Sequence, residues 1–137
     1  MGSSYTVHCS KCGRHTTISE GAFFRSPAYA DEILAGERGK QAKLNFERHP
    51  GKSAMFTYEV FVCSCGYTRS KLVMIIFGDD QTPWSIDPNR KIVWHNARCR
   101  CPLCGKNMRI SDGAPYTFRC RCGEWIEDEP CEYVNFD

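Results

Sequence analysis

Ten cysteines in a chain of 137 residues constrain this protein more than any other feature of its sequence. Eight of them form four close pairs, and a glycine follows each pair at once. Cysteines one or two residues apart are poor disulfide partners for each other, but they can direct two thiolates at one metal ion. The glycine permits a tight turn, often with positive φ, and leaves backbone N–H groups free to bond the sulfurs. The pattern therefore favours metal binding over a disulfide scaffold. The pairs and their glycines are Cys9–Cys12 with Gly13, Cys63–Cys65 with Gly66, Cys101–Cys104 with Gly105, and Cys120–Cys122 with Gly123.

The four pairs form a repeat of two unlike knuckles. The first and third have the pattern Cys-x-x-Cys-Gly followed by a basic residue, which is Arg14 or Lys106. The second and fourth have the pattern Phe-x-Cys-x-Cys-Gly and begin at Phe61 and Phe118. One knuckle of each kind, with a segment between them, thus occurs twice in the chain.

At these residues the sequence resembles the zinc-ribbon superfamily, with two four-cysteine ribbons in tandem. In that family two knuckles at the tips of β-hairpins donate four thiolates to a tetrahedral Zn²⁺. The layout also resembles small uncharacterised bacterial double-zinc-ribbon proteins that begin with Met-Gly-x-Ser-Tyr, a resemblance that carries no activity. The resemblance to two zinc ribbons implies two Zn²⁺ per chain. Chain order and the repeat favour an uncrossed pairing, in which the first knuckle joins the second and the third joins the fourth. The alternative is a crossed pairing, in which each site takes one knuckle from each half of the chain. The expected sites are Cys9, Cys12, Cys63 and Cys65 for the first ion, and Cys101, Cys104, Cys120 and Cys122 for the second.

The all-cysteine ligand sets indicate a structural ion and no enzyme. Zinc is favoured because a four-thiolate site closed by two short knuckles suits a redox-silent ion, and a rubredoxin-like iron site is the competitor. Four thiolates leave no coordination position for a catalytic water. The sequence also contains no glycine-rich phosphate loop, no Gly-x-Ser-x-Gly and no His-Glu-x-x-His. The histidines His8, His15 and His49 are expected to be surface groups, or groups that support the ligands, rather than ligands themselves.

Two cysteines, Cys99 and Cys131, lie outside the pairs. Cys99 and Cys101 are themselves a Cys-x-Cys, so Cys99 is an alternative ligand, although only Cys101–Cys104 carries the following glycine. The favoured interpretation is two spare thiols in a reducing cytoplasm. The alternatives are a third ion held with His95, or a catalytic Cys99 beside His95.

The segment lengths predict a small, metal-stabilised α+β fold of two β-hairpin ribbons. Fifteen residues separate Cys104 from Cys120 and suit a plain hairpin of strands 107–110 and 116–119. Fifty residues separate Cys12 from Cys63, too many for a structureless loop. We therefore expect a helical insertion at about 19–54 and an antiparallel sheet. The predicted helices span 27–35 and 40–48, and the predicted strands span 56–62, 71–77 and 92–94.

We place a domain boundary near residue 80, with the first ribbon and its insertion in 1–80 and the second ribbon with an acidic tail in 81–137.

Charge is unevenly distributed over the second half of the chain. Between residues 90 and 121 there are eight Lys or Arg against one acid, and from residue 124 onward there are six acids and neither Lys nor Arg. These basic residues either neutralise the thiolates and pair with the tail or contact nucleic acid. The candidate contacts are Arg98, Arg100, Lys106, Arg109, Arg119 and Arg121.

These observations predict a non-enzymatic zinc-binding protein that acts as a protein-interaction adaptor or regulator. The alternative is a nucleic-acid-binding module that uses the basic 90–121 segment, with Trp94, Tyr116, Phe118 and Trp125 either stacking on bases or forming the ribbon's core. Eight thiolates and two Zn²⁺ lower the formal charge from +2 to about −2, which favours the protein partner. No secretory signal and no membrane-length apolar run are visible, so we expect a cytoplasmic protein with no membrane contact.

Overall fold

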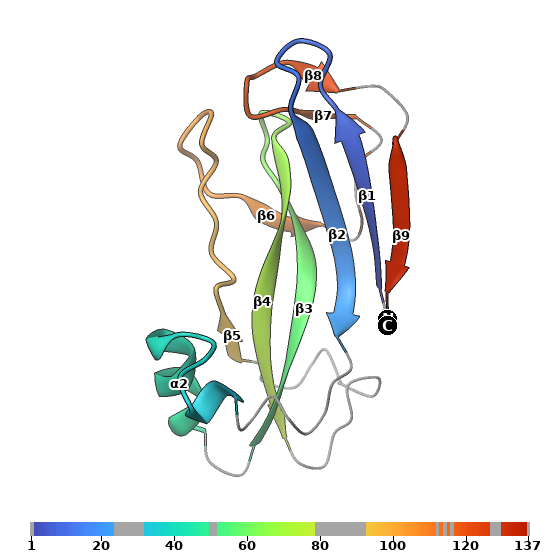
Figure 1. The fold of residues 1–137 in the computed structure, drawn as a ribbon. Coiled ribbons are helices and arrows are strands. Elements are labelled where there is room, and N and C mark those ends of the chain that lie inside the picture. The colour runs from blue at the N-terminus through green and yellow to red at the C-terminus, as the bar shows by residue number, and fades with distance from the viewer. Residues whose placement is uncertain are drawn as a thin grey trace. The chain divides into compact units, whose positions relative to one another are not determined.

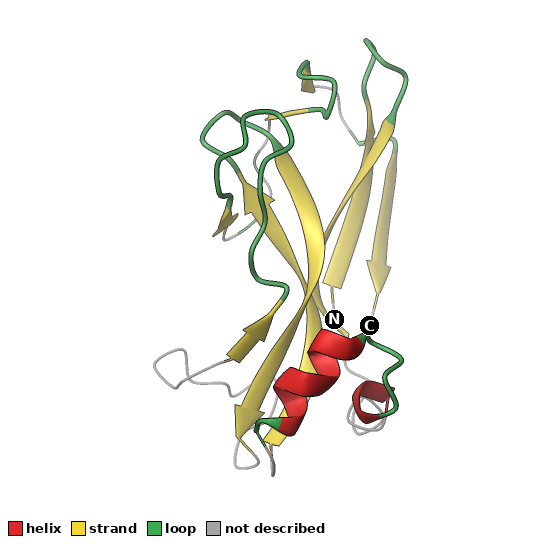
Figure 2. Cartoon of the chain, turned by 90° about the vertical axis from the view of Figure 1, so that its left-hand side faces the viewer, coloured by secondary structure: helices red, strands yellow, loops and turns green. Residues whose placement is uncertain are grey.

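The computed structural model describes residues 2–23, 32–49, 52–78, 93–111, 113, 115, 117–126 and 130–136. This part of the chain is a small α+β protein dominated by antiparallel strands, with few helices (Figures 1 and 2). The elements are β1 (Gly2–His8), β2 (His15–Phe23), α2 (Lys40–Glu47), β3 (Lys52–Val62), β4 (Thr68–Gly78), β5 (Val93–His95), β6 (Arg109–Ser111), β7 (Phe118–Arg119), β8 (Trp125–Ile126) and β9 (Glu132–Phe136).

Most of the described strands belong to one sheet with the order β5-β4-β3-β2-β1-β9. Strand β1 pairs antiparallel with β2 from Gly2↔Gly21 to His8↔His15. On its other edge β1 pairs antiparallel with β9, the last strand of the chain (Figure 1). This pairing brings the end of the chain beside its beginning, so the first knuckle, after β1, is close to the segment that carries the last knuckle.

The hydrophobic core beneath this part of the sheet follows from the two-residue period of β-strands. In β1 the buried Val7 alternates with the exposed His8, and the buried Cys9 follows. The cluster includes cysteines of the first and last knuckles, so core and knuckles are one packed region. Its buried members are Val7, Cys9, Ile18, Val60, Val62, Phe118, Cys120 and Ile126, with Tyr5 packed against them.

The structure divides into two compact units, each made of separate segments. One contains Met1–Gly21, Tyr58–Leu72 and Arg98–Asp137, and it holds all four knuckles. The other contains Ala22–Thr57 and Val73–Ala97, with α2 and β5. The sequence predicts two consecutive domains, with a boundary near residue 80 that lies outside the described residues.

Helix and strand positions match several expectations from the sequence. Helix α2 (Lys40–Glu47) lies where the second helix was predicted, and residues 32–34 are helical within the predicted 27–35, whose earlier part lies outside the described residues. Strands β3, β4 and β5 include or overlap the predicted 56–62, 71–77 and 92–94. Because β2 continues to Phe23 and β3 begins at Lys52, the segment between them is shorter than the predicted insertion at about 19–54.

The predicted hairpin of 107–110 with 116–119 is wrong for the described residues. Strand β6 pairs antiparallel with β3, where Val62 faces Arg109 and Val60 faces Ser111. Strand β7 pairs instead with β8, where Phe118 faces Ile126. Each arm of the expected hairpin therefore has a partner that lies elsewhere in the chain.

Candidate metal centre

Eight cysteines converge into two groups of four. In each group the four Sγ atoms all lie within 4.8 Å of one another. We call the first group the outer site, because its knuckles are nearest the chain ends, and the second the inner site. The outer site consists of Cys9, Cys12, Cys120 and Cys122, and the inner site consists of Cys63, Cys65, Cys101 and Cys104.

The structure corrects the predicted grouping of these ligands. The sequence paired Cys9–Cys12 with Cys63–Cys65, whereas in the structure the knuckles are crossed, so each site takes one knuckle from each half. Strand pairing is the cause. Val62, one residue before Cys63, faces Arg109 in β6, and so the second knuckle meets the third. The strands beside the first and fourth knuckles share one core, which brings those two knuckles together.

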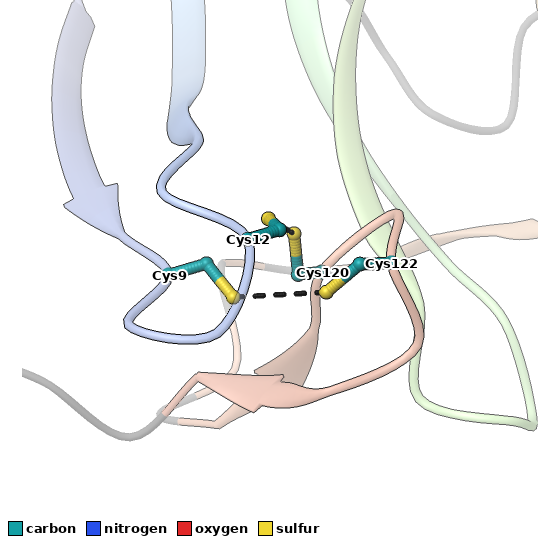
Figure 3. A group of neighbouring side chains, drawn as sticks. All are labelled: Cys9, Cys12, Cys120 and Cys122. Carbon is teal, nitrogen blue, oxygen red and sulfur yellow. Dashed lines mark hydrogen bonds between the residues drawn. The ribbon is translucent and has the colours of Figure 1, made fainter.

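The sulfur separations are close to those around one four-coordinate ion, with the shortest in the inner site. In the outer site the Sγ atoms of Cys9 and Cys122 are 3.7 Å apart, and those of Cys12 and Cys120 are 3.6 Å apart (Figure 3). In the inner site the corresponding separations are 3.3 Å and 3.6 Å. A tetrahedral ion with metal–sulfur bonds of about 2.3 Å spaces its sulfurs about 3.8 Å apart. Each group could therefore hold one metal ion.

All four knuckles share one backbone arrangement. The N–H of the first cysteine donates to the carbonyl of the residue after the glycine, and the glycine N–H donates back to the first cysteine's carbonyl. In the first knuckle these bonds are Cys9 to Arg14 and Gly13 to Cys9, both 2.9 Å. In the fourth they are Cys120 to Glu124 and Gly123 to Cys120, both 2.8 Å. The Cys-x-Cys knuckle is thus the Cys-x-x-Cys knuckle shortened by one residue. The expected positive φ is confirmed at Gly13, Gly66, Gly105 and Gly123, with values of 75°, 102°, 75° and 95°.

The thiols of each site differ in acidity. The backbone N–H of Cys12 is the main cause that lowers the pKa of Cys9 to about 7, and that of Cys65 lowers the pKa of Cys63 to about 6. Burial raises the pKa of Cys101 to about 11 and the pKa of Cys120 to about 12. Each site therefore has one thiol with a lowered pKa and at least one with a raised pKa. Because metal binding must expel the protons held by the thiols, metal uptake weakens as the pH falls.

The two sites are joined through the second and fourth knuckles. The backbone N–H of Arg119 donates to the carbonyl of Gly66 at 2.9 Å, and Tyr67 forms a parallel bridge with Arg119. The indole of Trp125 lies against Gly66, where an added Cβ would come within 2.9 Å of Cζ3. The Arg119 guanidinium donates through Nε to the carbonyl of Gly123 at 2.7 Å. The inner and outer sites therefore share one junction, which the sequence patterns did not indicate.

The other candidate ligands stay outside the two groups. Cys99 is buried, with its Sγ atom 3.6 Å from Met108 Sδ, so the alternative register with Cys101 is not adopted. Cys131 is exposed, with its Sγ atom 3.3 Å from the carbonyl oxygen of Thr6. The side chain of His95 lies outside the described residues.

The predicted nucleic-acid contacts divide into one knuckle residue and five exposed side chains. Arg119 is half-buried in the junction, whereas Arg98, Arg100, Lys106, Arg109 and Arg121 are exposed. None of the five forms an ion pair with a described carboxylate. Phe118 is buried in the core, and Trp125 is 55% exposed. The side chains of Trp94 and Tyr116 lie outside the described residues.

Comparison with known protein-family models, curated proteins and solved structures finds no match. The two four-cysteine groups are compatible with tandem zinc ribbons, although no family match supports that membership. No helix in the described part of the chain is long and apolar enough to cross a membrane.

The crossed arrangement predicts how serine substitutions combine. Replacing Cys9 and Cys12 with serine should remove one bound ion per chain, because the outer site keeps only two thiolates. Adding Cys120→Ser and Cys122→Ser should remove no second ion, whereas adding Cys63→Ser and Cys65→Ser should remove both. Native mass spectrometry with elemental analysis counts the ions. Loss of the second ion with the Cys120 and Cys122 substitutions would restore the uncrossed grouping.

The junction predicts that a methyl group is tolerated less well at Gly66 than at Gly105. Both glycines have positive φ, so either alanine should cost about 1–3 kcal/mol in the free energy of unfolding. Gly66→Ala should cost about 1–3 kcal/mol more, because it overlaps the Trp125 indole, while nothing lies within 4 Å of the corresponding point at Gly105. Denaturant unfolding of the metal-loaded protein measures the free energy of unfolding of both alanine variants. Trp125→Ala in the Gly66→Ala background should recover the difference, and equal costs for the two alanines would contradict a restraining contact.

Proposed function

We propose that the protein binds two structural zinc ions and works as a non-enzymatic interaction module. The convergence of eight sulfurs into two groups of four carries this proposal. Thiolate ligands suit zinc or iron, and a closed four-thiolate set built from short knuckles suits a redox-silent ion that stabilises the fold. With four thiolates on each ion, no coordination position remains for water, so the ions supply folding free energy rather than catalysis.

The burial of the ligands supports a structural role for the ions. Cys9 and Cys120 in the outer site, and Cys63 and Cys101 in the inner site, are buried. Cys9 and Cys120 are members of the hydrophobic core, so an ion on them extends the packed interior to the knuckles. A small domain with a limited core commonly depends on such an ion for its stability.

This proposal predicts two zinc ions per chain in protein purified without added metal. Native mass spectrometry and elemental analysis should show that stoichiometry. Removing the ions with a chelator should unfold the unit that carries the knuckles, seen as loss of strand signal in far-ultraviolet circular dichroism, and added Zn²⁺ should restore it. Iron as the resident metal would overturn the zinc assignment, and metal-free protein with a mass deficit from disulfides would overturn metal binding.

A protein partner is the interaction that the surface supports best. The described sheet ends at β9, whose free edge offers backbone N–H and C=O groups to an extended segment of another protein. Tyr133 and Val134 in this strand are 63% and 46% exposed. With both ions bound the formal charge is about −2, which does not favour a polyanion. We therefore propose an adaptor that takes an extended protein segment as an added strand.

Nucleic acid is the second candidate partner. Five basic side chains of the 98–121 segment are exposed without an ion pair to a described carboxylate, and the exposed Trp125 follows the last of them in sequence. Exposed guanidinium groups together with an exposed indole are a combination that can contact phosphates and stack on bases in single strands. This arrangement supports contact with a single strand more than reading of a duplex groove.

The two candidates predict opposite responses to a labelled single-stranded oligonucleotide. An adaptor should show no binding that depends on the exposed arginines. Phosphate contacts by five basic residues should instead give a slope of about −3.5 for log affinity against log salt. In that case Arg109→Glu should weaken binding, and Lys40→Glu, an equal charge change at the exposed first residue of α2, should not. Fluorescence anisotropy across a salt series measures both variants, and the steep slope with an Arg109 effect would replace the adaptor proposal.

A further inference from the structure

We propose that His8 and His15 form a third metal site, separate from the two cysteine sites. The site takes a divalent transition-metal ion that accepts imidazole ligands, such as Ni²⁺, Cu²⁺ or Zn²⁺. Water supplies the remaining coordination positions. Nothing in the sequence pattern relates these two histidines to each other. The antiparallel pairing of β1 with β2 brings them together.

The register of the first hairpin places the two histidines directly opposite each other. His8 ends β1, His15 begins β2, and they are partners in the β1–β2 ladder. Both are exposed, and one pair farther along the same face Thr6 Oγ1 is 2.8 Å from Thr17 Oγ1. The neighbouring Val7 and Cys9 are buried, as the alternation of side chains in a strand requires. The imidazoles therefore lie on the solvent face, away from the core-facing Cys9.

The separation of the two rings matches a pair of imidazoles on one ion. Their centroids are 4.9 Å apart, and their planes are tilted by 46°. An ion about 2.1 Å from one nitrogen of each ring lies about 3.2 Å from each centroid. Ligand angles from about 90° to about 109° then place the centroids about 4.5–5.2 Å apart. The observed separation lies inside this range, so an ion can bridge the rings with little movement of the backbone.

The ring nitrogens are free to bind an ion. Neither imidazole forms a hydrogen bond or an ion pair with another described residue. No third histidine, cysteine or carboxylate of the described chain joins them within 4.8 Å. Two protein ligands and several waters make an exchangeable site, unlike the closed cysteine sites. The filled outer site, which begins at the next residue, has a formal charge of −2 and attracts a cation.

A bound ion would link β1 to β2 immediately before the first knuckle. The segment between His8 and His15 carries Cys9 and Cys12, which are half of the outer site. An ion that bridges the base of this loop binds the folded hairpin more tightly than the unfolded chain, and so favours the folded state. The third ion is therefore expected to raise the thermal stability of the protein with its cysteine sites filled.

Nickel titration tests the proposal on the full chain as purified, with its resident metal content measured first. Ni²⁺ should bind at one site per chain by isothermal titration calorimetry, with the resident ions retained. His8→Ala and His15→Ala should each lower the affinity at least about tenfold, because the second imidazole binds intramolecularly. His49→Ala, a matched histidine outside the hairpin, should bind as the unsubstituted chain does. His15→Gln should repeat the loss with a polar side chain retained.

Nuclear magnetic resonance gives a second readout that does not depend on variants. Paramagnetic Ni²⁺ should broaden the side-chain signals of His8 and His15 before those of His49. Absence of nickel binding would overturn the proposal, as would unchanged affinity in the His8 and His15 variants. Displacement of the resident ions, seen as a thiolate-to-nickel charge-transfer band, would place the ion on the cysteines and also overturn it.

Discussion

The convergence of thiolates from distant knuckles is the constraint on which this structure depends. Residues 113 apart in the chain meet in the outer site, and residues 41 apart meet in the inner site. Compared with the uncrossed pairing predicted from chain order, closing these longer loops costs only about 1 kcal/mol more. Structural Zn²⁺ in small zinc-finger peptides contributes about 10–16 kcal/mol. Loop entropy therefore scarcely opposes crossing, and the packing of the strands decides which knuckles meet.

This balance explains what the sequence could predict. The eight ligands, the positive φ of the glycines and the position of α2 depend on local patterns, and the structure agrees with each of them. The grouping of the knuckles and the fate of the strands after Cys104 depend instead on the pairing of β6 with β3 and of β9 with β1. Those pairings join residues far apart in sequence, and a repeat of similar motifs contains no information about them. The repeat instead suggested two consecutive ribbons.

Arg119 shows how the structure adds a local role that the sequence pattern of a residue does not indicate. Its position beside Cys120 in a basic segment made it a candidate phosphate contact. In the structure its backbone N–H and its guanidinium both bind knuckle carbonyls, those of Gly66 and Gly123. The guanidinium thus supports the turn around a thiolate site, as expected for a cation beside bound sulfurs. The exposed arginines form no ion pair with a described carboxylate, so their guanidinium groups, unlike that of Arg119, face solvent.

The shared junction has a consequence for how the two sites respond to metal loss. The knuckle with Cys63 and Cys65 contacts the knuckle with Cys120 and Cys122 through backbone hydrogen bonding and the Trp125 indole. If an ion left the outer site, its fourth knuckle would become mobile. The hydrogen bond from Arg119 and the contact of the Trp125 indole would then hold Gly66 in its turn less firmly. The inner site then loses part of its preorganisation, and its affinity for metal falls. The same contacts act in the reverse direction because linkage between sites is reciprocal. Ions in the two sites would therefore stabilise one structure together, although each would be held by its own four sulfurs.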